Sequence, residues 1–278
     1  MFQFPLSVPR LILLSGAYLL KKLENNWGNL FQKVKKLLFL LANLICQLKI
    51  LTYHSIMLTQ IINAKILTPQ GWLKDGSVLM RDNKILEVTN CDLAVIGAEL
   101  IDAKGMYVVP GGVEIHCHGG GGGDFMEGTE EAFRTAINAH MKHGTTSIFP
   151  TLSSSTVPMI EAAAETCTKL MAEPDSPVLG LHLEGHYLNI KMAGGQMPEN
   201  IKDPDPNEYI PIVEKWNCIK RWDAAPELPG AMQFGKYITG KGIVASVAHT
   251  QAEYEDIRSA WDSGYTLATH FYNAMPGF

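Results

Sequence analysis

The sequence predicts an α/β fold in which βα units build a parallel sheet of the (β/α)8-barrel type, preceded by a small module of β-strands. Strand-like and helix-like segments alternate from residue 110 to residue 278, which is the pattern of βα units. Histidine and glutamate side chains recur where the predicted strands end, and such strand ends are where barrel active sites are built. Residues 57–109 show short strand patterns without a helical period.

Residues 1–56 differ in charge from the rest of the chain. They hold seven basic residues against one acidic residue, a net charge of +6, so the remainder carries −11 within a total of −5. An acidic body is a poor binder of nucleic acid. Five cysteines are scattered without a CxxC pair, which favours a reducing, cytoplasmic setting over a disulfide framework.

The first 56 residues are rich in leucine and lysine but carry no membrane-spanning pattern. Their longest uncharged apolar stretch, Leu37 to Cys46, is shorter than the roughly 18 to 20 residues that cross a bilayer. The sequence after it offers no convincing signal-peptide cleavage site. A basic amphipathic helix at a membrane surface is one interpretation. We favour another, in which Met57 begins the functional protein and residues 1–56 are an upstream extension outside the fold.

The β module is predicted from alternating and β-branched segments between residues 58 and 112. A turn at TPQG separates the first two segments, and the pair Asp82-Asn83 marks a hairpin inside the second, because such dipeptides favour two-residue turns. The predicted strand segments are residues 58–67, 77–90, 93–105 and 106–112.

The first strand of the barrel is predicted in the stretch VVPGGVEIHCHGGGGGDF, residues 108–125. Side chains alternate along a strand, so His116 and His118 point to one side and Cys117 to the other. Two imidazoles so placed can share one cation, and the glycines let the backbone approach it. For this motif alone, two hydrogen-bonded core histidines beside a flexible turn are an equal alternative.

The remaining elements alternate in type to the end of the sequence. The first predicted helix has Thr129 as its N-cap and Gly144 as its stop, and we interpret His140 and His143 as surface or packing residues. A long polar loop is predicted at residues 186–209, and loops of such length within a compact domain are usually functional. Helices are predicted at residues 129–144, 155–173, 210–216, 232–239 and 252–264, and strands at 145–152, 177–185, 218–227, 242–250 and 266–275.

Six barrel strands are predicted, ending near His118, Leu152, Glu184, Glu227, His249 and His270. A closed barrel needs eight strands. Because the sequence stops shortly after the sixth, we expect it to be a fragment of a barrel.

Five of the residues at these strand ends form a candidate metal site. Parallel strand ends face one pocket, so imidazole and carboxylate groups there converge. Each residue alone has a plainer explanation as a buried, hydrogen-bonded side chain, but five at equivalent positions predict a metal centre. Nitrogen and oxygen ligands suit zinc, or iron or manganese, which would activate water for hydrolysis of an amide or similar bond. The proposed ligands are His116, His118, Glu184, His249 and His270.

The series PGGVEIHCHG, LHLEG, APE, VAHT and THFYNAMP resembles the amidohydrolase superfamily and, within it, the N-acetylglucosamine-6-phosphate deacetylase family. The resemblance covers the chain from about Met57 to its end. It implies a metal-dependent (β/α)8 barrel at residues 110–278 and a small β-sandwich portion at residues 57–109. It further implies hydrolysis of a phosphosugar acetamide in amino-sugar catabolism, a product pair of glucosamine 6-phosphate and acetate, and a homodimer.

The same resemblance implies roles for individual residues. Glu184, His249 and His270 match the principal metal ligands, and the HxH pair matches ligands of a second metal that only some members bind. In the NAM segment, Asn273 and the backbone N–H of Ala274 match contacts to the substrate phosphate. Gln196, in AGGQ, lies where the family places a polar residue near the sugar.

Two departures from the family pattern stand out. His186 follows HLEG, where the family has a proline. The family's general acid/base is an aspartate at the end of the eighth strand, expected beyond Phe278, so no catalytic acid or base can be identified here. We therefore expect the 278-residue chain to gather metal ligands but to turn over slowly or not at all.

Two other interpretations stay open. The first is that the chain is another amidohydrolase, such as a deacetylase of a related amino sugar, a cyclic amidase or a deaminase. Those members often bridge two metals with a modified lysine on a strand that here carries Glu184. The second interpretation is a non-catalytic module that binds a metal or a partner, with residues 1–56 as one route to membrane association.

Overall fold

The computed structural model describes residues 58–82, 84–91 and 95–277, and the predictions made for residues 1–56 lie outside this part of the chain. Two compact units divide between Val108 and Val109, and each is described by itself. Within the described residues, no helix combines the length and the apolar character needed to cross a membrane.

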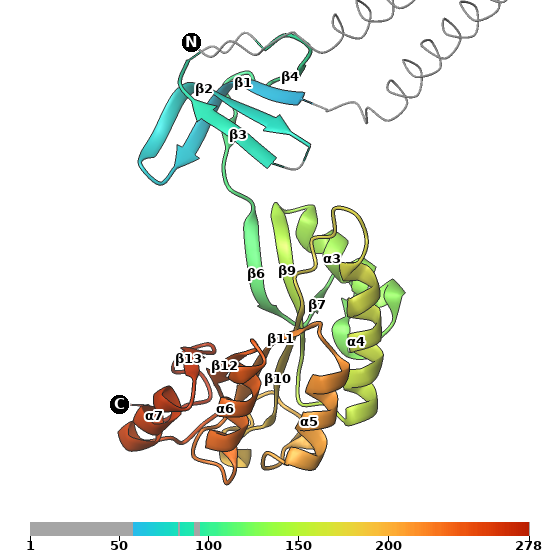
Figure 1. Ribbon diagram of the computed structural model, residues 1–278, viewed down its shortest axis with the longest axis vertical. Helices are drawn as coiled ribbons and strands as arrows, with labels where there is room; N and C mark the ends of the chain where they lie inside the picture. Colours follow the sequence, from blue (N-terminus) through green and yellow to red (C-terminus); the bar gives the residue numbers. More distant parts are fainter. Residues whose placement is uncertain (1–57, 83, 92–94, 278) are drawn as a thin grey trace, which may run out of the picture. The chain divides into compact units, whose positions relative to one another are not determined.

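The first unit is a single mixed sheet (Figure 1). Its strands follow the order β3-β2-β1-β4, and β5 pairs with β1. The β1–β2 and β2–β3 pairs are antiparallel, whereas β4 and β5 run parallel to β1. Its strands are β1 (Leu58–Thr68), β2 (Gly71–Arg81), β3 (Lys84–Thr89), β4 (Glu99–Asp102) and β5 (Tyr107–Val108).

The predicted hairpin joins β2 to β3. Arg81 pairs with Lys84, which leaves a two-residue loop, and Asp82 has a φ of 52°. Two-residue hairpin loops require positive φ, and aspartate tolerates it better than most residues. Ala64, Ile66, Val78 and Ala103 form a small apolar core in this unit.

The second unit contains six parallel strands in the order β13-β12-β11-β10-β9-β6. Figure 1 shows the helices following one another around one side of this sheet. The strands are β6 (Gly112–Cys117), β9 (Thr145–Leu152), β10 (Leu181–Tyr187), β11 (Ile219–Ala224), β12 (Val244–Val247) and β13 (Tyr265–Ala268). The helices are α3 (Glu130–Met141), α4 (Val157–Met171), α5 (Pro206–Lys215), α6 (Ala231–Gly240) and α7 (Tyr254–Asp262).

Short elements fill the connections of the second unit. The glycine run after His118 forms the two-stranded ribbon of β7 (Gly119–Gly120) and β8 (Gly123–Asp124), followed by the 3₁₀ turn η1 (Phe125–Glu127). The long loop predicted after β10 holds two further 3₁₀ turns, η2 (Ile190–Met192) and η3 (Pro198–Asn200).

Local signals explain where the helices begin. The Thr129 hydroxyl accepts a hydrogen bond from the Ala132 N–H at the start of α3, as its N-cap prediction required. Helix α5 was predicted to begin at Ile210, but it begins at Pro206. The Asp205 side chain caps it, and proline suits the first helical position because its missing N–H would have no partner there.

One predicted strand was too long. Strand β11 was expected to reach Glu227, but its ladder with β12 ends at Ala224. Pro226 follows closely, and proline has no N–H to donate to a ladder. Glu227 therefore lies in the loop after β11 and not on the strand itself.

The alternation of side chains along β10 gives the strand an apolar face and a polar face. Leu181 and Leu183 belong to the main apolar core, while His182 and Glu184 point to the opposite face. All four side chains are buried. The apolar core between sheet and helices includes the large side chains Phe125, Phe133, Tyr187, Trp222 and Phe234.

The sheet is curled so that its polar face is the inside of a partial barrel. Strands β6 and β13 stand at opposite edges of the sheet, yet the rings of His116 and His270 lie 5.8 Å apart between centroids. Arg221 on β11 reaches across the interior, where its Nη1 donates to the Ile115 carbonyl on β6 at 3.2 Å. The predicted barrel type is confirmed for the six strands that the structure describes.

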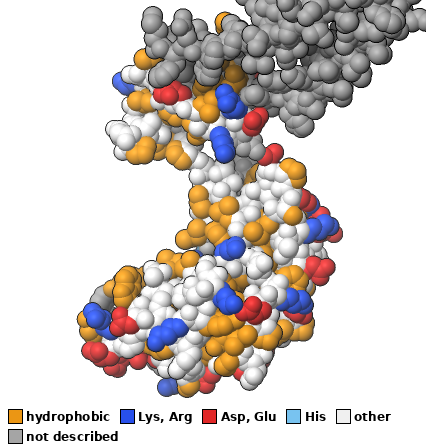
Figure 2. Space-filling view, viewed as in Figure 1, with side chains coloured by type: hydrophobic (Ala, Val, Ile, Leu, Met, Phe, Trp, Pro, Cys, Tyr) orange, Lys and Arg blue, Asp and Glu red, His pale blue; other side chains and the backbone are white. Residues whose placement is uncertain are grey.

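Charged side chains gather on the outside of the second unit over α3 and α4 (Figure 2). Arg134 pairs with Glu130 at i, i+4 and with Glu173, and Lys169 also pairs with Glu130. Such exposed pairs contribute little stability. They mark this side as the solvated face, away from the polar interior of the curled sheet.

Candidate metal centre

Glu184 lies at the middle of the polar interior and is 2% exposed. It belongs to β10, so the curvature of the sheet brings side chains from both edges toward its carboxylate. Four histidine Nε2 atoms surround it. Their distances to the nearest Glu184 oxygen are 3.5 Å for His116, 3.0 Å for His118, 3.3 Å for His249 and 2.8 Å for His270.

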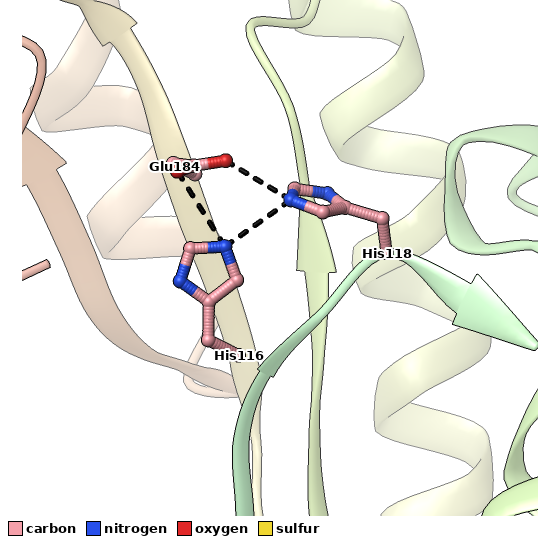
Figure 3. A group of neighbouring side chains, drawn as sticks. All are labelled: His116, His118 and Glu184. Carbon is pink, nitrogen blue, oxygen red and sulfur yellow. Dashed lines mark hydrogen bonds and ion pairs between the residues drawn. The ribbon is translucent and has the colours of Figure 1, made fainter. Parts of the chain in front are cut away.

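The HxH pair approaches Glu184 from β6, as Figure 3 shows. The two Nε2 atoms of His116 and His118 lie 3.1 Å apart. The backbone N–H of His116 donates to Glu114 Oε1 at 2.9 Å, and His118 Nδ1 lies 3.2 Å from the Ser153 hydroxyl. Both rings therefore point to the same side, as strand alternation predicted, while Cys117 packs against the apolar core.

His249 and His270 approach from the loops after β12 and β13. Their Nε2 atoms lie 3.2 Å apart. His249 Nδ1 lies 2.7 Å from the Met192 carbonyl and His270 Nδ1 lies 3.1 Å from the Asn273 carbonyl. Both residues have positive φ, 44° and 30°, a strained conformation that persists at functional sites when the surroundings enforce it.

These contacts determine which nitrogen carries the proton in the second pair. A carbonyl oxygen only accepts, so Nδ1 of His249 and Nδ1 of His270 each donate. In the neutral rings the Nε2 lone pairs then face each other and the Glu184 oxygens. Lone pairs facing a carboxylate repel it unless a proton or a metal ion lies between them. The donor set therefore fits a divalent metal held by nitrogen and oxygen.

The ligand atoms form two overlapping groups that share one residue. One group is His116, His118 and Glu184, and the other is Glu184, His249 and His270. In each group the ligand atoms lie within 4.8 Å of one another. These are the two groups of this kind in the described part of the chain, so the geometry offers places for one or two cations on either side of Glu184.

Electrostatics favour the charged carboxylate. Burial alone would raise the pKa of Glu184, but the hydrogen bonds from the surrounding histidines outweigh it and hold that pKa well below its usual value. The hydrogen bond to Glu184 raises the pKa of His118 against the effect of burial. Burial lowers the pKa of His249, yet Glu184 and the Met192 carbonyl raise it overall. Metal binding must displace such protons.

Gln196 holds Glu184 in place from the long loop. Its Nε2 donates to Glu184 Oε2 at 2.8 Å, and its Oε1 accepts from the Ser154 N–H at 2.6 Å. The amide is buried and bonded at both ends. The structure therefore places Gln196 at the site, in contact with the carboxylate, where it orients the candidate ligand.

Gly185, directly after Glu184, cannot be replaced without strain. Its φ is 95°, and a Cβ built on it would lie 2.7 Å from Leu188 Cδ1 and 2.8 Å from Ser154 Oγ. Glycine alone adopts this conformation without a steric cost. The backbone beside the ligand is thus fixed by the packing of two neighbouring segments.

His186, the departure from the family pattern, lies under the long loop. It is fully buried, and its Nε2 lies 2.6 Å from Glu208 Oε1. Burial lowers the pKa of His186, while the hydrogen bonds from His186 and Lys202 lower the pKa of Glu208 to about 2 against the opposing effect of its own burial. His186 thus ties the end of β10 to α5.

A second polar layer, which sequence analysis missed, lies beneath the ligands. His182 Nε2 lies 2.9 Å from Asp223 Oδ1, and its ring contacts that of His116. Thr269 donates to Asp223 Oδ2 at 2.5 Å, and Arg221 Nε donates to Asp223 Oδ1 at 3.1 Å. Their signal was their strand spacing, because His182 and Asp223 point inward with Glu184.

The remaining predicted residues lie at the rim. Asn273 donates from its side chain to the His270 carbonyl at 3.1 Å, and the Ala274 carbonyl accepts from the Thr250 N–H at 3.1 Å. His140 bonds to the Gly119 carbonyl at 3.1 Å, which agrees with its interpretation as a packing residue.

Residues 107–278 match the amidohydrolase family. The chain is 30% identical over 216 residues to an N-acetylglucosamine-6-phosphate deacetylase of Haemophilus influenzae, a match that covers 77% of this chain and 56% of that protein. It is 26% identical over 228 residues to an N-acetylgalactosamine-6-phosphate deacetylase of Escherichia coli O157:H7, which covers 79% of this chain and 58% of that protein.

A solved structure supports the same likeness. It is a mutant of N-acetyl-D-glucosamine-6-phosphate deacetylase from Mycobacterium smegmatis in complex with N-acetyl-D-glucosamine-6-phosphate. The TM-score is 0.71 at 29% identity, and the match covers 80% of this chain and 57% of that chain. The chain thus spans somewhat more than half the length of the relatives that it matches.

Proposed function

The chain belongs to the amidohydrolase family, whose members are metal-dependent, and from this premise we propose that its centre serves the deacetylation of N-acetylglucosamine 6-phosphate. The net reaction consumes water and yields glucosamine 6-phosphate and acetate. Relatives that are deacetylases of amino-sugar 6-phosphates support the substrate class.

One observation carries the proposal, namely the position of Glu184 between two histidine pairs. Two cations on either side would share its carboxylate, as the two metals of other amidohydrolases share a modified lysine. Without a metal ion, the Nε2 atoms of His249 and His270 need protons in order to face the carboxylate. The centre is therefore better explained as a metal site than as a set of core histidines.

We propose zinc as the metal, with Glu184, His249 and His270 as its ligands and His116 and His118 as ligands of a second ion. Imidazole nitrogen and carboxylate oxygen suit zinc, and iron and manganese take the same ligands. A divalent cation bound there polarises a carbonyl group and lowers the pKa of a water molecule.

The chain's own residues orient this chemistry. Gln196 fixes the Glu184 carboxylate, and the carbonyls of Met192 and Asn273 fix the two imidazoles. Asn273 and Ala274 lie three and four residues after His270, so a phosphosugar bound by them would place its acetamide near the ligands. The position of Asn273 and Ala274 at the rim supports an arrangement with the phosphate at the rim and the acetamide near the ligands.

The experiment is a substrate panel on the metal-loaded 278-residue chain. It compares the binding of N-acetylglucosamine 6-phosphate, N-acetylgalactosamine 6-phosphate and unphosphorylated N-acetylglucosamine, together with acetate release. We expect metal-dependent binding that prefers a 6-phosphate, with slow release of acetate or none. Binding that is equally strong without the 6-phosphate or without the metal would contradict the proposal. A preference for N-acetylgalactosamine 6-phosphate would favour the function of an N-acetylgalactosamine-6-phosphate deacetylase instead.

Asn273→Ala provides the matched test of the phosphate contact. We expect it to weaken binding of the phosphorylated sugar by about tenfold, since a hydrogen bond to a charged group contributes about 1.5 kcal/mol. Binding of unphosphorylated N-acetylglucosamine should change little. A loss of equal size for both sugars would mean that Asn273 acts through His270 instead.

We place the reaction in the cytoplasm and expect a homodimer. The cysteines Cys91, Cys117, Cys167 and Cys218 are free thiols, which supports a reducing compartment. Sedimentation of the purified chain tests the oligomeric state directly.

A further inference from the structure

The carboxylate of Glu227 lies in the loop after β11 and accepts hydrogen bonds from two other rim loops. Asn189 Nδ2 donates to Oε1 at 2.8 Å from the loop after β10. The Gln251 N–H donates to Oε1 at 2.7 Å, and the Thr250 hydroxyl donates to Oε2, both from the loop after β12. A carboxylate suits this place because its two oxygens can accept several hydrogen bonds and, when ionised, it has no proton to donate.

His249 lies in the loop after β12, and the loop after β10 contacts it as well. Thr250 and Gln251 follow it in sequence, so the bonds to Glu227 fix the backbone directly after the ligand. On the other side, the Asn189 N–H donates to the His249 carbonyl at 2.9 Å, and the turn that begins at Asn189 presents the Met192 carbonyl to His249 Nδ1 at 2.7 Å.

The same contacts extend to the third rim loop. The Thr250 N–H donates to the Ala274 carbonyl at 3.1 Å, which joins the segment after His249 to the NAM segment. Thr250 is 3% exposed, so water cannot readily replace its bonds. Glu227 therefore joins the segment directly after His249 to the loop after β10, whose backbone bonds to His249.

We infer that Glu227 is a positioning residue for His249, and that its hydrogen bonds set the affinity of the metal group formed by Glu184, His249 and His270. His249 has a strained positive φ of 44°, so its geometry depends on surrounding bonds that enforce it. The inference rests on the proposed metal centre, and it adds Glu227 to the residues that support this centre.

A second explanation must be separated from this one, because a nearby negative charge would also attract a cation. Glu227→Gln distinguishes the two. Its amide oxygen can accept from Asn189 and Gln251, and its NH₂ group can donate to the Thr250 hydroxyl, which is able to accept. The charge is lost while the hydrogen bonds remain. Glu227→Ala removes both.

The experiment measures the affinity of the metal-free chain for Zn²⁺ and Co²⁺ by competition with a chromophoric chelator, together with the Co²⁺ absorption spectrum and the melting temperature. We expect Glu227→Ala to weaken the first metal equivalent by about tenfold or more, as loss of supporting contacts around metal ligands does, and to change the Co²⁺ spectrum. Glu227→Gln should stay within about threefold of wild type with an unchanged spectrum. Glu161→Ala, whose partner is the surface residue Lys215, is the control.

Each outcome decides the question. Wild-type affinity in Glu227→Ala, with or without a lower melting temperature, would overturn the inference and leave the metal centre standing. Equal losses in the Ala and Gln variants would overturn it in favour of a charge effect. A wild-type chain that binds neither ion would overturn the metal centre and the inference with it. If Glu227→Ala does not fold, Asn189→Ala replaces it, with a severalfold loss expected and wild-type affinity as the contradicting result.

Discussion

The two histidine pairs around Glu184 are built differently. His116 and His118 stand on and after an edge strand, with side chains 21% and 38% exposed. His249 and His270 stand on loops with positive φ, and backbone carbonyls fix both of their Nδ1 atoms. The side chain of His249 is 5% exposed and that of His270 is 27% exposed, so the backbone support, and not burial, separates the two pairs.

This difference predicts two metal places of unequal strength. Fixed rings lose little freedom when a metal binds, and preorganised sites gain affinity for that reason. The bonded partner of His118 is the Ser153 hydroxyl, which can turn to donate or accept. We therefore expect the group with His249 and His270 to bind first and the group with His116 and His118 to bind second.

Replacing Glu184, the ligand that both groups share, should have the largest effect on metal affinity and should weaken both groups alike. Glu184→Gln takes one charged oxygen donor from both groups, so we expect affinity for both equivalents of Zn²⁺ to fall by more than about 100-fold, beyond the range for outer contacts. Metal titration against a chelator measures it, with Glu161→Gln as the control. Retention of one tight equivalent would mean that Glu184 is not shared.

Replacing one histidine of each pair should separate the two groups. We expect His249→Asn to weaken the first equivalent by about 100-fold, and His116→Asn to leave the first equivalent within about threefold while removing the second, since outer contacts alone alter affinity by 10- to 100-fold. Stoichiometry and affinity of Co²⁺ binding measure both. Equal losses in the two variants would break the comparison.

Much of the fold could be predicted because its signals are local. Strand alternation, the Thr129 cap and the Asp82 turn all act within a few residues, and the structure has the predicted order of elements. The start of α5 was missed because Asp205 and Pro206 resemble loop residues in sequence, and they act as a cap and a first helical position only once the chain turns there.

The candidate site could be predicted only in part, for a related reason. His116, His118, Glu184, His249 and His270 were found because strand ends of a parallel sheet meet at one rim. Glu227 received no role, since its partners lie on loops whose paths no pattern gives. Likewise, the bonds that fix Nδ1 of His249 come from a backbone carbonyl, which every residue has.

Removing the hydroxyl beside His118 should have a small effect on the weaker group alone. Ser153→Ala deletes one bonded partner of Nδ1, but the nearby Thr151 backbone, which contributes to the raised pKa of His118, remains. We expect the second metal equivalent to weaken by about threefold and the first to stay unchanged, which is less than the usual effect of an outer contact. A larger loss would show that the HxH pair is as firmly fixed as the other.

The smallest expected effect is a pH dependence of the metal-free protein. The hydrogen bond to Glu184 raises the pKa of His118 above its ordinary value of 6.5, against the effect of burial. A raised pKa means that the stabilisation is fully present below pH 6.5 and is lost as the pH rises through the folded value. With its partial exposure, such a pair contributes up to about 1 kcal/mol, or about 2 to 4 °C. Wild type should therefore melt higher than His118→Asn by more at pH 6 than at pH 9.

The comparison of wild type with His249→Asn should show a pH dependence of the same sign. Burial is the largest influence on the pKa of His249 and lowers it, but the hydrogen bonds to Glu184 and Met192 raise that pKa overall. Opposite signs for the two variants would mean that the pairs do not share the Glu184 charge.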